Sequence, residues 1–392
     1  MRRSRVRIPK AALWKPQDSL AVTWGFCLSA IFGAIQSRRR GGPVPAFPGR
    51  VAGQQNDLRA HTRRRVGSFE QGIFVMRIAV IDDYNSAAAA LPCWAGLPAG
   101  ADVRFFSDRV GDPDALVERL AEFDAVVAMR ERTAFGAEVL ARLPRLKLLV
   151  TAGMHNAAID LSAAARHGVV VSGTRMTPFP AAELAWALIL ELSRRAGAQD
   201  AGVRGGSWQS GVGTGLAGGT LGVVGLGKLG TRVAAVGAAF GMEVVAWSPH
   251  MTDERAEAVG VRAVGKEELF SSSDVVSVHL RLSSATTGLV AEDDLRRMRR
   301  TAFLVNTSRA QIVDEDALIK ALGEGWIAGA GLDVYEEEPL PAGHRLLDAP
   351  NTVLTPHIGY VTGDNFALVY GDSVEAVNAY LDGAPVRVLT GE

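Results

Sequence analysis

The stretch Thr220-Leu-Gly-Val-Val-Gly-Leu-Gly-Lys-Leu-Gly230 decides the fold of this chain. It has the pattern of a buried strand that runs into a glycine-rich turn and then into a helix. Gly225 permits the tight turn, Gly227 lets the backbone approach a pyrophosphate, and Gly230 lets the helix pack closely on the strand. The free amides and the positive dipole end at the start of the helix would then bind the phosphates.

The residues around this stretch complete a βαβ unit. An amphipathic Val/Ala helix is predicted over Thr231–Phe240, and Glu243–Trp247 has the pattern of the next strand. A second GxGxxG pattern, at Gly213–Gly218, follows Trp208-Gln-Ser-Gly instead of a strand, so we interpret it as a loop. The dinucleotide turn is therefore expected at Gly225–Gly230.

Composition is that of an ordinary α/β protein. The chain has 392 residues, 48% of them hydrophobic and 21% charged, and the formal net charge is zero. That length leaves room for about two or three domains. Residues 1–75 carry 14 Lys/Arg and only 3 Asp/Glu, so the rest of the chain is acidic. An acidic body argues against a nucleic-acid partner, because phosphate contacts need clustered cations.

Cysteine and histidine usage excludes two further classes. Cys27 and Cys93 are the only cysteines, which is too few for a disulfide framework and indicates a reducing, cytoplasmic location. The seven histidines are scattered and have no ligand spacing. We therefore expect no bound metal.

The N-terminal segment differs in composition from the rest. Its apolar run Leu20–Ile35 is short for a membrane span, although it also resembles the apolar part of a signal peptide. A good first strand opens at Met76-Arg-Ile-Ala-Val-Ile. We expect Met76 to be the working start, residues 1–75 to be disordered or absent in the cell, and no membrane contact.

Beyond Met76, short Val/Ile/Leu strands alternate with helices, which predicts an α/β protein with two doubly wound parallel sheets. Residues 76–175 with 361–392 are expected to form a flavodoxin-like substrate domain, and residues 176–360 a Rossmann dinucleotide-binding domain. Helix 181–195 would connect the two domains, and helix 365–381 would pack back on the first. The predicted strands are 77–82, 101–106, 125–129, 148–151 and 169–172, then 221–224, 244–247, 275–279, 302–306, 329–333 and 352–355.

Reactive side chains occur in three segments at predicted strand ends, which converge at one edge of a parallel sheet: Val305-Asn-Thr-Ser-Arg309, Gly331-Leu-Asp-Val-Tyr-Glu-Glu-Glu-Pro339 and Leu354-Thr-Pro-His-Ile-Gly359. Arg309 offers a planar fork of donors for a carboxylate and a keto oxygen. His357 can give or take a proton near neutral pH. Glu338 beside it would hold the imidazole and favour its protonated form.

With these motifs in this order, residues 76–392 resemble the NAD-dependent D-2-hydroxyacid dehydrogenase family, which includes phosphoglycerate dehydrogenase and glyoxylate/hydroxypyruvate reductase. The resemblance implies hydride transfer between NAD(P)H and a small 2-keto or D-2-hydroxy acid. It makes Arg309 the substrate-binding arginine, Glu338 the catalytic carboxylate and His357 the proton-transferring histidine. It also implies a homodimer, for which Gln199–Leu216 is a candidate arm.

The same resemblance implies further contacts. On the substrate side these are Arg130 and the backbone amides at Gly153 and Met154. The cofactor-binding residues that it implies are Gly225, Gly227, Lys228, Leu229, Gly230, Ser248, His279, Leu280, Thr307, Ser308 and Asp333.

Three positions depart from the family pattern. Ser248 replaces the acidic residue that would bond the adenosine ribose, so NAD is expected and NADP stays open. Arg281 stands where the family has proline or an apolar residue, and the sequence gives no account of it. Tyr360 replaces a second glycine and is expected to narrow the entrance for substrate.

Two other functions stay open from the sequence. One is a dinucleotide-sensing regulator similar to the corepressors that resemble these dehydrogenases. The other is a formate dehydrogenase, although that family pairs its histidine with glutamine and Glu338 argues against it. The sequence does not fix which acid is bound, and 3-phosphoglycerate remains among the candidates.

Overall fold

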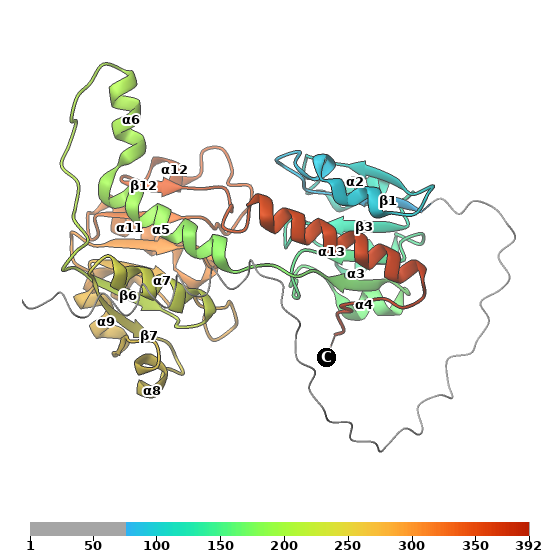
Figure 1. Ribbon diagram of the computed structural model, residues 1–392. Coiled ribbons are helices and arrows are strands. Elements are labelled where there is room, and N and C mark those ends of the chain that lie inside the picture. The colour runs from blue at the N-terminus through green and yellow to red at the C-terminus, as the bar shows by residue number, and fades with distance from the viewer. Residues whose placement is uncertain (1–75, 392) are drawn as a thin grey trace, which may run out of the picture. The chain divides into compact units, whose positions relative to one another are not determined.

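Two parallel β-sheets with helices on both faces make up residues 76–391, which a computed structural model describes (Figure 1). The first sheet has the order β2-β1-β3-β4-β5. This is the flavodoxin-like order, and the five strands predicted for it are confirmed. The predictions about residues 1–75 lie outside the described residues. The strands are β1 (Arg77–Val80), β2 (Asp102–Phe105), β3 (Ala125–Ala128), β4 (Leu148–Thr151) and β5 (Val170–Gly173).

The second sheet has seven strands in the order β12-β11-β10-β9-β6-β7-β8. Six were predicted and are confirmed. The seventh, β8 (Arg262–Ala263), was missed because a two-residue edge strand has no periodicity to detect. The other strands are β6 (Thr220–Val224), β7 (Glu243–Trp247), β9 (Val275–Val278), β10 (Phe303–Asn306), β11 (Gly329–Leu332) and β12 (Thr352–Leu354).

Alternate side chains of the first sheet enter two separate cores. Ala79 and Ile81 pack with α2 (Pro113–Leu120), α3 (Ala137–Ala141) and α4 (Leu161–Arg166). Ile78 and Val80 share the other core with Phe366, Val369 and Val377 of α13 (Gly363–Leu381). The predicted return of the C-terminal helix to the first sheet is confirmed, whereas the domain boundaries near residues 175 and 360 stay predictions.

The second sheet is covered in the same way. Helices α5 (Phe179–Arg194) and α7 (Lys228–Ala239) pack on one face. Helices α9 (Lys266–Ser272), α10 (Glu292–Arg297) and α11 (Glu315–Gly323) pack on the other. The remaining helices are α6 (Ala196–Arg204), α8 (Asp253–Glu257), α12 (Arg345–Asp348) and the short 3₁₀ turns η2 (Ala88–Ala90), η3 (Pro92–Gly96) and η4 (Ala310–Ile312).

The strand order places β6 between β7 and β9, and the chain changes direction across the sheet at this point. In open α/β sheets a ligand binds at the carboxyl ends of the strands beside such a reversal. The turn after β6 therefore lies where a dinucleotide is expected. No helix within residues 76–391 is long and apolar enough to cross a membrane.

Candidate active site

The turn between β6 and α7 has the geometry that its glycines predict. Gly225 has a φ of 101°, and a Cβ there would lie 2.8 Å from the carbonyl oxygen of His279. A Cβ on Gly230 would lie 2.0 Å from the carbonyl oxygen of Gly225. A Cβ on Gly227, by contrast, would meet no protein atom within 4 Å. Packing explains two of the glycines, and the open space at the third fits a bound pyrophosphate.

Around that turn lie the other residues that the cofactor was expected to contact. Lys228 and Leu229 form the first turn of α7, which begins three residues earlier than predicted because Gly227 is its N-cap. Ser308 Oγ donates to the carbonyl oxygen of Leu280 (3.1 Å) and fixes the facing loop. Thr307 Oγ1 is buried without a hydrogen-bond partner among the described residues. A buried orphan hydroxyl at this wall also fits a ligand that completes its hydrogen bond.

The side chain of His279 points into the protein and does not face the expected cofactor site. Its ring is buried and bonded to Ser277 Oγ at 2.8 Å, and burial lowers the pKa of His279 to about 4. The imidazole is therefore neutral and internal, and only the main chain of His279 borders the glycine turn.

Ser248, which follows β7, is half-buried and carries no charge. Arg255 Nη1 donates to the carbonyl oxygen of His250 at 3.2 Å, so its guanidinium lies close to this strand end. Neither residue excludes a 2′-phosphate. Arg281 is exposed, and the structure gives no account of it.

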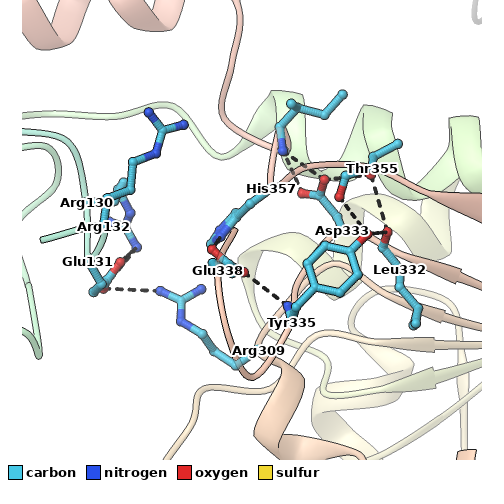
Figure 2. A network of polar contacts seen from close by, with 12 residues as sticks. Arg130, Glu131, Arg132, Arg309, Leu332, Asp333, Tyr335, Glu338, Thr355 and His357 are labelled. Atoms are coloured by element: carbon cyan, nitrogen blue, oxygen red, sulfur yellow. Dashed lines mark hydrogen bonds and ion pairs between the residues drawn. The ribbon is translucent and has the colours of Figure 1, made fainter. Parts of the chain in front are cut away.

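Three strand ends of the second sheet supply the candidate catalytic groups, and they converge as predicted (Figure 2). The loop after β10 is shaped by Asn306, whose side chain bonds the Arg309 carbonyl (3.0 Å) and the Ser308 amide (3.0 Å). The Arg309 guanidinium is one-third exposed at the site. Its Nη1 donates to the Ser308 carbonyl at 2.8 Å, and the exposed part of the group is accessible to a carboxylate ligand.

Glu338 and His357 form a close pair. Glu338 Oε2 lies 2.7 Å from His357 Nδ1, and Glu338 Oε1 accepts from the amide of Tyr335 at 3.1 Å (Figure 2). Burial alone raises the pKa of Glu338, but the hydrogen bond and charge of His357 outweigh it and leave this pKa below its ordinary value. The carboxylate therefore orients the ring and leaves Nε2 as the nitrogen that can meet a substrate.

Asp333 holds the loop that carries the histidine. Its carboxylate accepts from the amides of Ile358 and Gly359, both at 2.8 Å, and from Thr355 Oγ1 at 2.6 Å. Asp333 is almost fully buried, and this burial raises its pKa despite those bonds. In this structure Asp333 acts on the backbone beside His357, and its expected role next to the nicotinamide stays a prediction.

The first sheet contributes the residues that face this pair. Arg130 follows β3, and its Nη1 donates to the Ala152 carbonyl at 3.3 Å. Gly153 has a φ of 93°, which favours glycine, and a Cβ there would lie 2.5 Å from that same Nη1, so a larger residue would also displace the end of Arg130. The Gly153 amide donates to Thr174 Oγ1 at 3.0 Å, which means that a substrate would compete with this hydroxyl. Met154 is exposed beside it.

Sequence reasoning missed four residues of this face. Glu131 Oε1 lies 3.3 Å from Arg309 Nη2. Arg132 Nη1 donates to the Asp82 carbonyl, and its guanidinium lies over the rings of Tyr84 (4.2 Å) and Tyr360 (5.6 Å). Applying the rule of strand carboxyl ends to β1 and β3 would have found Asp82, Tyr84, Glu131 and Arg132.

Tyr360 lies beside His357, and the narrowing of a substrate entrance by its ring stays a prediction. Its ring centroid is 5.7 Å from that of His357, in an edge-to-face arrangement. Burial raises the pKa of Tyr360 to about 12, so it stays a neutral phenol at neutral pH.

Comparisons with known proteins agree with this geometry. Residues 186–359 match the family model described as "D-isomer specific 2-hydroxyacid dehydrogenase, NAD binding domain". A glyoxylate reductase of Korarchaeum cryptofilum is 39% identical over 249 residues, which cover 62% of this chain and 75% of the relative. A D-3-phosphoglycerate dehydrogenase of Synechocystis is 35% identical over 275 residues, 69% of this chain and 49% of that longer relative.

A solved structure shares the fold. The crystal structure of a putative D-3-phosphoglycerate dehydrogenase oxidoreductase from Ralstonia solanacearum superposes with a TM-score of 0.77 at 39% identity, covering 80% of this chain and 96% of that one. The glycine turn, the residues of its wall and the strand-end groups fit NAD(H) or NADP(H) as the cofactor. The chain therefore belongs to the D-2-hydroxyacid dehydrogenase family and is an NAD(P)-dependent oxidoreductase that acts on the CH–OH group of 2-hydroxy acids.

Proposed function

We propose that this chain reduces a small 2-keto acid to the D-2-hydroxy acid, with Arg309, Glu338 and His357 as its catalytic machinery. The observation that carries the proposal is the 2.7 Å pair of His357 Nδ1 and Glu338 Oε2, together with the Arg309 guanidinium at the neighbouring strand end. Acid–base catalysis by a positioned histidine contributes about 10²- to 10⁴-fold in rate.

Each side chain has a distinct part. Arg309 binds the substrate carboxylate and draws electron density from the keto oxygen. Bound NAD(P)H supplies the hydride for the carbonyl carbon. His357 gives the proton on Nε2 to the oxygen, and the carboxylate of Glu338 stabilises the imidazolium before that transfer. The reverse reaction runs through the same groups, with neutral His357 taking the hydroxyl proton.

The substrate contacts from the first sheet are part of the same proposal. Arg130 lies half-buried beside Gly153 and within 3.4 Å of Glu131, so its guanidinium borders the same space as Arg309. The Met154 amide follows Gly153 in the loop after β4. These groups would hold the carboxylate end of the acid.

The experiment is turnover by the full chain. NADH and NADPH oxidation is followed with glyoxylate, hydroxypyruvate, pyruvate, 2-ketoisocaproate and phosphohydroxypyruvate, with His357→Ala measured beside the wild type. We expect one or more acids to be reduced and His357→Ala to lose at least 100-fold in kcat with cofactor affinity retained. Cofactor binding without turnover of any acid would contradict the proposal and favour the regulator.

We further propose a cytoplasmic homodimer. Val203, Trp208 and Val212 are 53%, 79% and 100% exposed along the segment that was predicted to be an arm. Exposed apolar side chains that recur within one segment are typical of a protein–protein contact. The scarcity of cysteine supports the reducing compartment.

A further inference from the structure

Glu131 places a negative charge beside the arginine that was assigned to the substrate carboxylate. Its Oε1 lies 3.3 Å from Arg309 Nη2 and 3.4 Å from Arg130 Nη2, and the side chain is 24% exposed (Figure 2). Charge-assisted pairs are usually shorter, at about 2.7–2.9 Å. The carboxylate therefore takes a long hydrogen bond from Nη2 of each guanidinium, whereas Nη1 of Arg130 donates to the Ala152 carbonyl and Nη1 of Arg309 to the Ser308 carbonyl.

The third arginine of this face already has its partners. Arg132 donates to the Asp82 carbonyl, and its guanidinium lies over the rings of Tyr84 and Tyr360. The Asp82 carboxylate accepts from Thr133 Oγ1 at 2.8 Å. Burial raises the pKa of Asp82, and this hydrogen bond and the charge of Arg132 offset only part of that rise. Arg132 is thus held by the Asp82 carbonyl and by the two tyrosine rings, and the Asp82 carboxylate lies close enough for the charge of Arg132 to act on it.

The remaining charges nearly balance. Arg130 and Arg309 are opposed by Glu131 and Glu338, so these four side chains together carry no net charge. The buried Asp333 carboxylate is held by the amides of Ile358 and Gly359 and by Thr355 Oγ1. Protonation of His357, which keto-acid reduction requires, leaves one positive charge in excess. That excess matches one substrate carboxylate. A second negative charge on the substrate would have no unpaired positive side chain among these groups to bind it, and Glu131 would repel it.

From this balance we propose that Glu131 is a specificity-determining residue that restricts the site to 2-keto acids with a single negative charge. The inference rests on the proposed function of the same site. It favours substrates whose third carbon is absent, uncharged or hydroxyl-bearing, because a hydroxyl can donate to the Glu131 carboxylate. It disfavours substrates with a phosphate or a second carboxylate at that position. Glyoxylate and hydroxypyruvate fit this class, and phosphohydroxypyruvate does not.

The test is Glu131→Gln, which removes the charge and keeps the shape. The ratio of kcat/KM for hydroxypyruvate to that for phosphohydroxypyruvate is measured for the full chain with its cofactor. We expect the wild type to prefer hydroxypyruvate and the variant to move the ratio about tenfold or more toward the phosphorylated acid. Glu131→Asp, which keeps the charge, should retain the wild-type preference. Glu138→Gln makes the same charge change on the exposed surface of α3 and should leave the ratio unmoved.

A second readout separates this inference from the proposed reaction. Binding of D-glycerate and of 3-phospho-D-glycerate is measured by calorimetry on the enzyme with NADH, where nothing turns over. The same tenfold change in relative affinity is expected in Glu131→Gln. If the wild type reduces no acid but this ratio shifts, the catalytic proposal fails and the charge selection stands. A shift below twofold, a wild-type preference for the phosphorylated acid, or no binding of either acid overturns the selection.

Discussion

The backbones of Arg130 and His357 adopt a conformation that is rare for residues other than glycine. Their φ angles are 55° and 53°, in the left-handed region. Such a residue costs about 1–3 kcal/mol and persists only where its surroundings fix it. Asn156 Nδ2 bonds the Arg130 carbonyl at 2.7 Å, and Asp333 bonds both amides after His357. At both positions, side-chain hydrogen bonds to the adjacent backbone hold the strained residue in place.

Glu338 should set the pH range of the reaction. The charge of His357 lowers the pKa of Glu338, and Glu338 favours the imidazolium in return, so in Glu338→Gln the alkaline limb of the reduction rate should move to lower pH. We expect kcat at neutral pH to fall by about 10- to 100-fold. The measurement is the rate–pH profile of keto-acid reduction. Glu337→Gln, an exposed neighbour in the same run, is the matched control, and an unmoved limb in Glu338→Gln would contradict the role.

The glycine turn allows binding and folding to be separated. Gly227→Ala adds a methyl group where no protein atom lies within 4 Å, so the cofactor-free protein should keep its thermal midpoint and bind NADH at least tenfold more weakly. Gly230→Ala places a Cβ 2.0 Å from the Gly225 carbonyl and should destabilise the fold by about 1–3 kcal/mol or more. Thermal unfolding and fluorescence titration check both. If both variants lost the same amount of stability, the prediction that of these two glycines only Gly230 is required for packing would be contradicted.

At the scale of elements, the end of β9 carries an acid-sensitive group. The pKa of His279 falls from 6.5 to about 4 on burial, so the unfolded chain binds more protons than the folded one in that interval. The contribution of neutral His279 to the free energy of unfolding is fully present above pH 6.5 and is lost as the pH falls toward 4. The shift is worth about 3 kcal/mol.

His279→Asn should remove this dependence. Between pH 7 and 4.5, the free energy of unfolding should fall by about 2–3 kcal/mol less in the variant than in the wild type. Urea unfolding at both pH values measures it. The same change at exposed His167 is the control, and identical acid losses in all three proteins would show that His279 is not the group responsible.

The elements that the sequence predicted are those with a clear pattern. The Val/Ile/Leu runs of β1 and β6 and the apolar stripe of α13 carry their own periodicity, so their type and approximate bounds followed. Strand β8 has two residues and forms only by pairing with β7. Of the site, Arg309 and His357 were predicted because they stand in dense motifs at strand ends, and their roles stay predictions. Glu131 was not, because nothing local shows that it meets an arginine 178 residues away.

At the scale of the whole molecule, the exposed apolar segment after α6 predicts self-association. Trp208→Ser combined with Val212→Ser should convert a dimer into a monomer with an unchanged circular dichroism spectrum. Size-exclusion chromatography with light scattering measures the mass of each. Leu347→Ser, an equally drastic change at a 51% exposed residue of α12, should leave the mass unchanged. A wild-type protein that is monomeric would contradict the proposed homodimer.

The packing of α13 on the first sheet also constrains the order of events during synthesis. Ile78 and Val80 share their core with Phe366, Val369 and Val377, almost three hundred residues later. Domains usually fold as they leave the ribosome, N-terminal first. Here one face of the sheet that is translated first is covered early only by the segment of η2 and η3, and it lacks α13 until nearly the whole chain has emerged. The helices that cover the second sheet, by contrast, are translated beside its strands. The dinucleotide-binding half can thus close before the substrate half, and the earliest apolar strands are those that a ribosome-associated chaperone would have to shield longest.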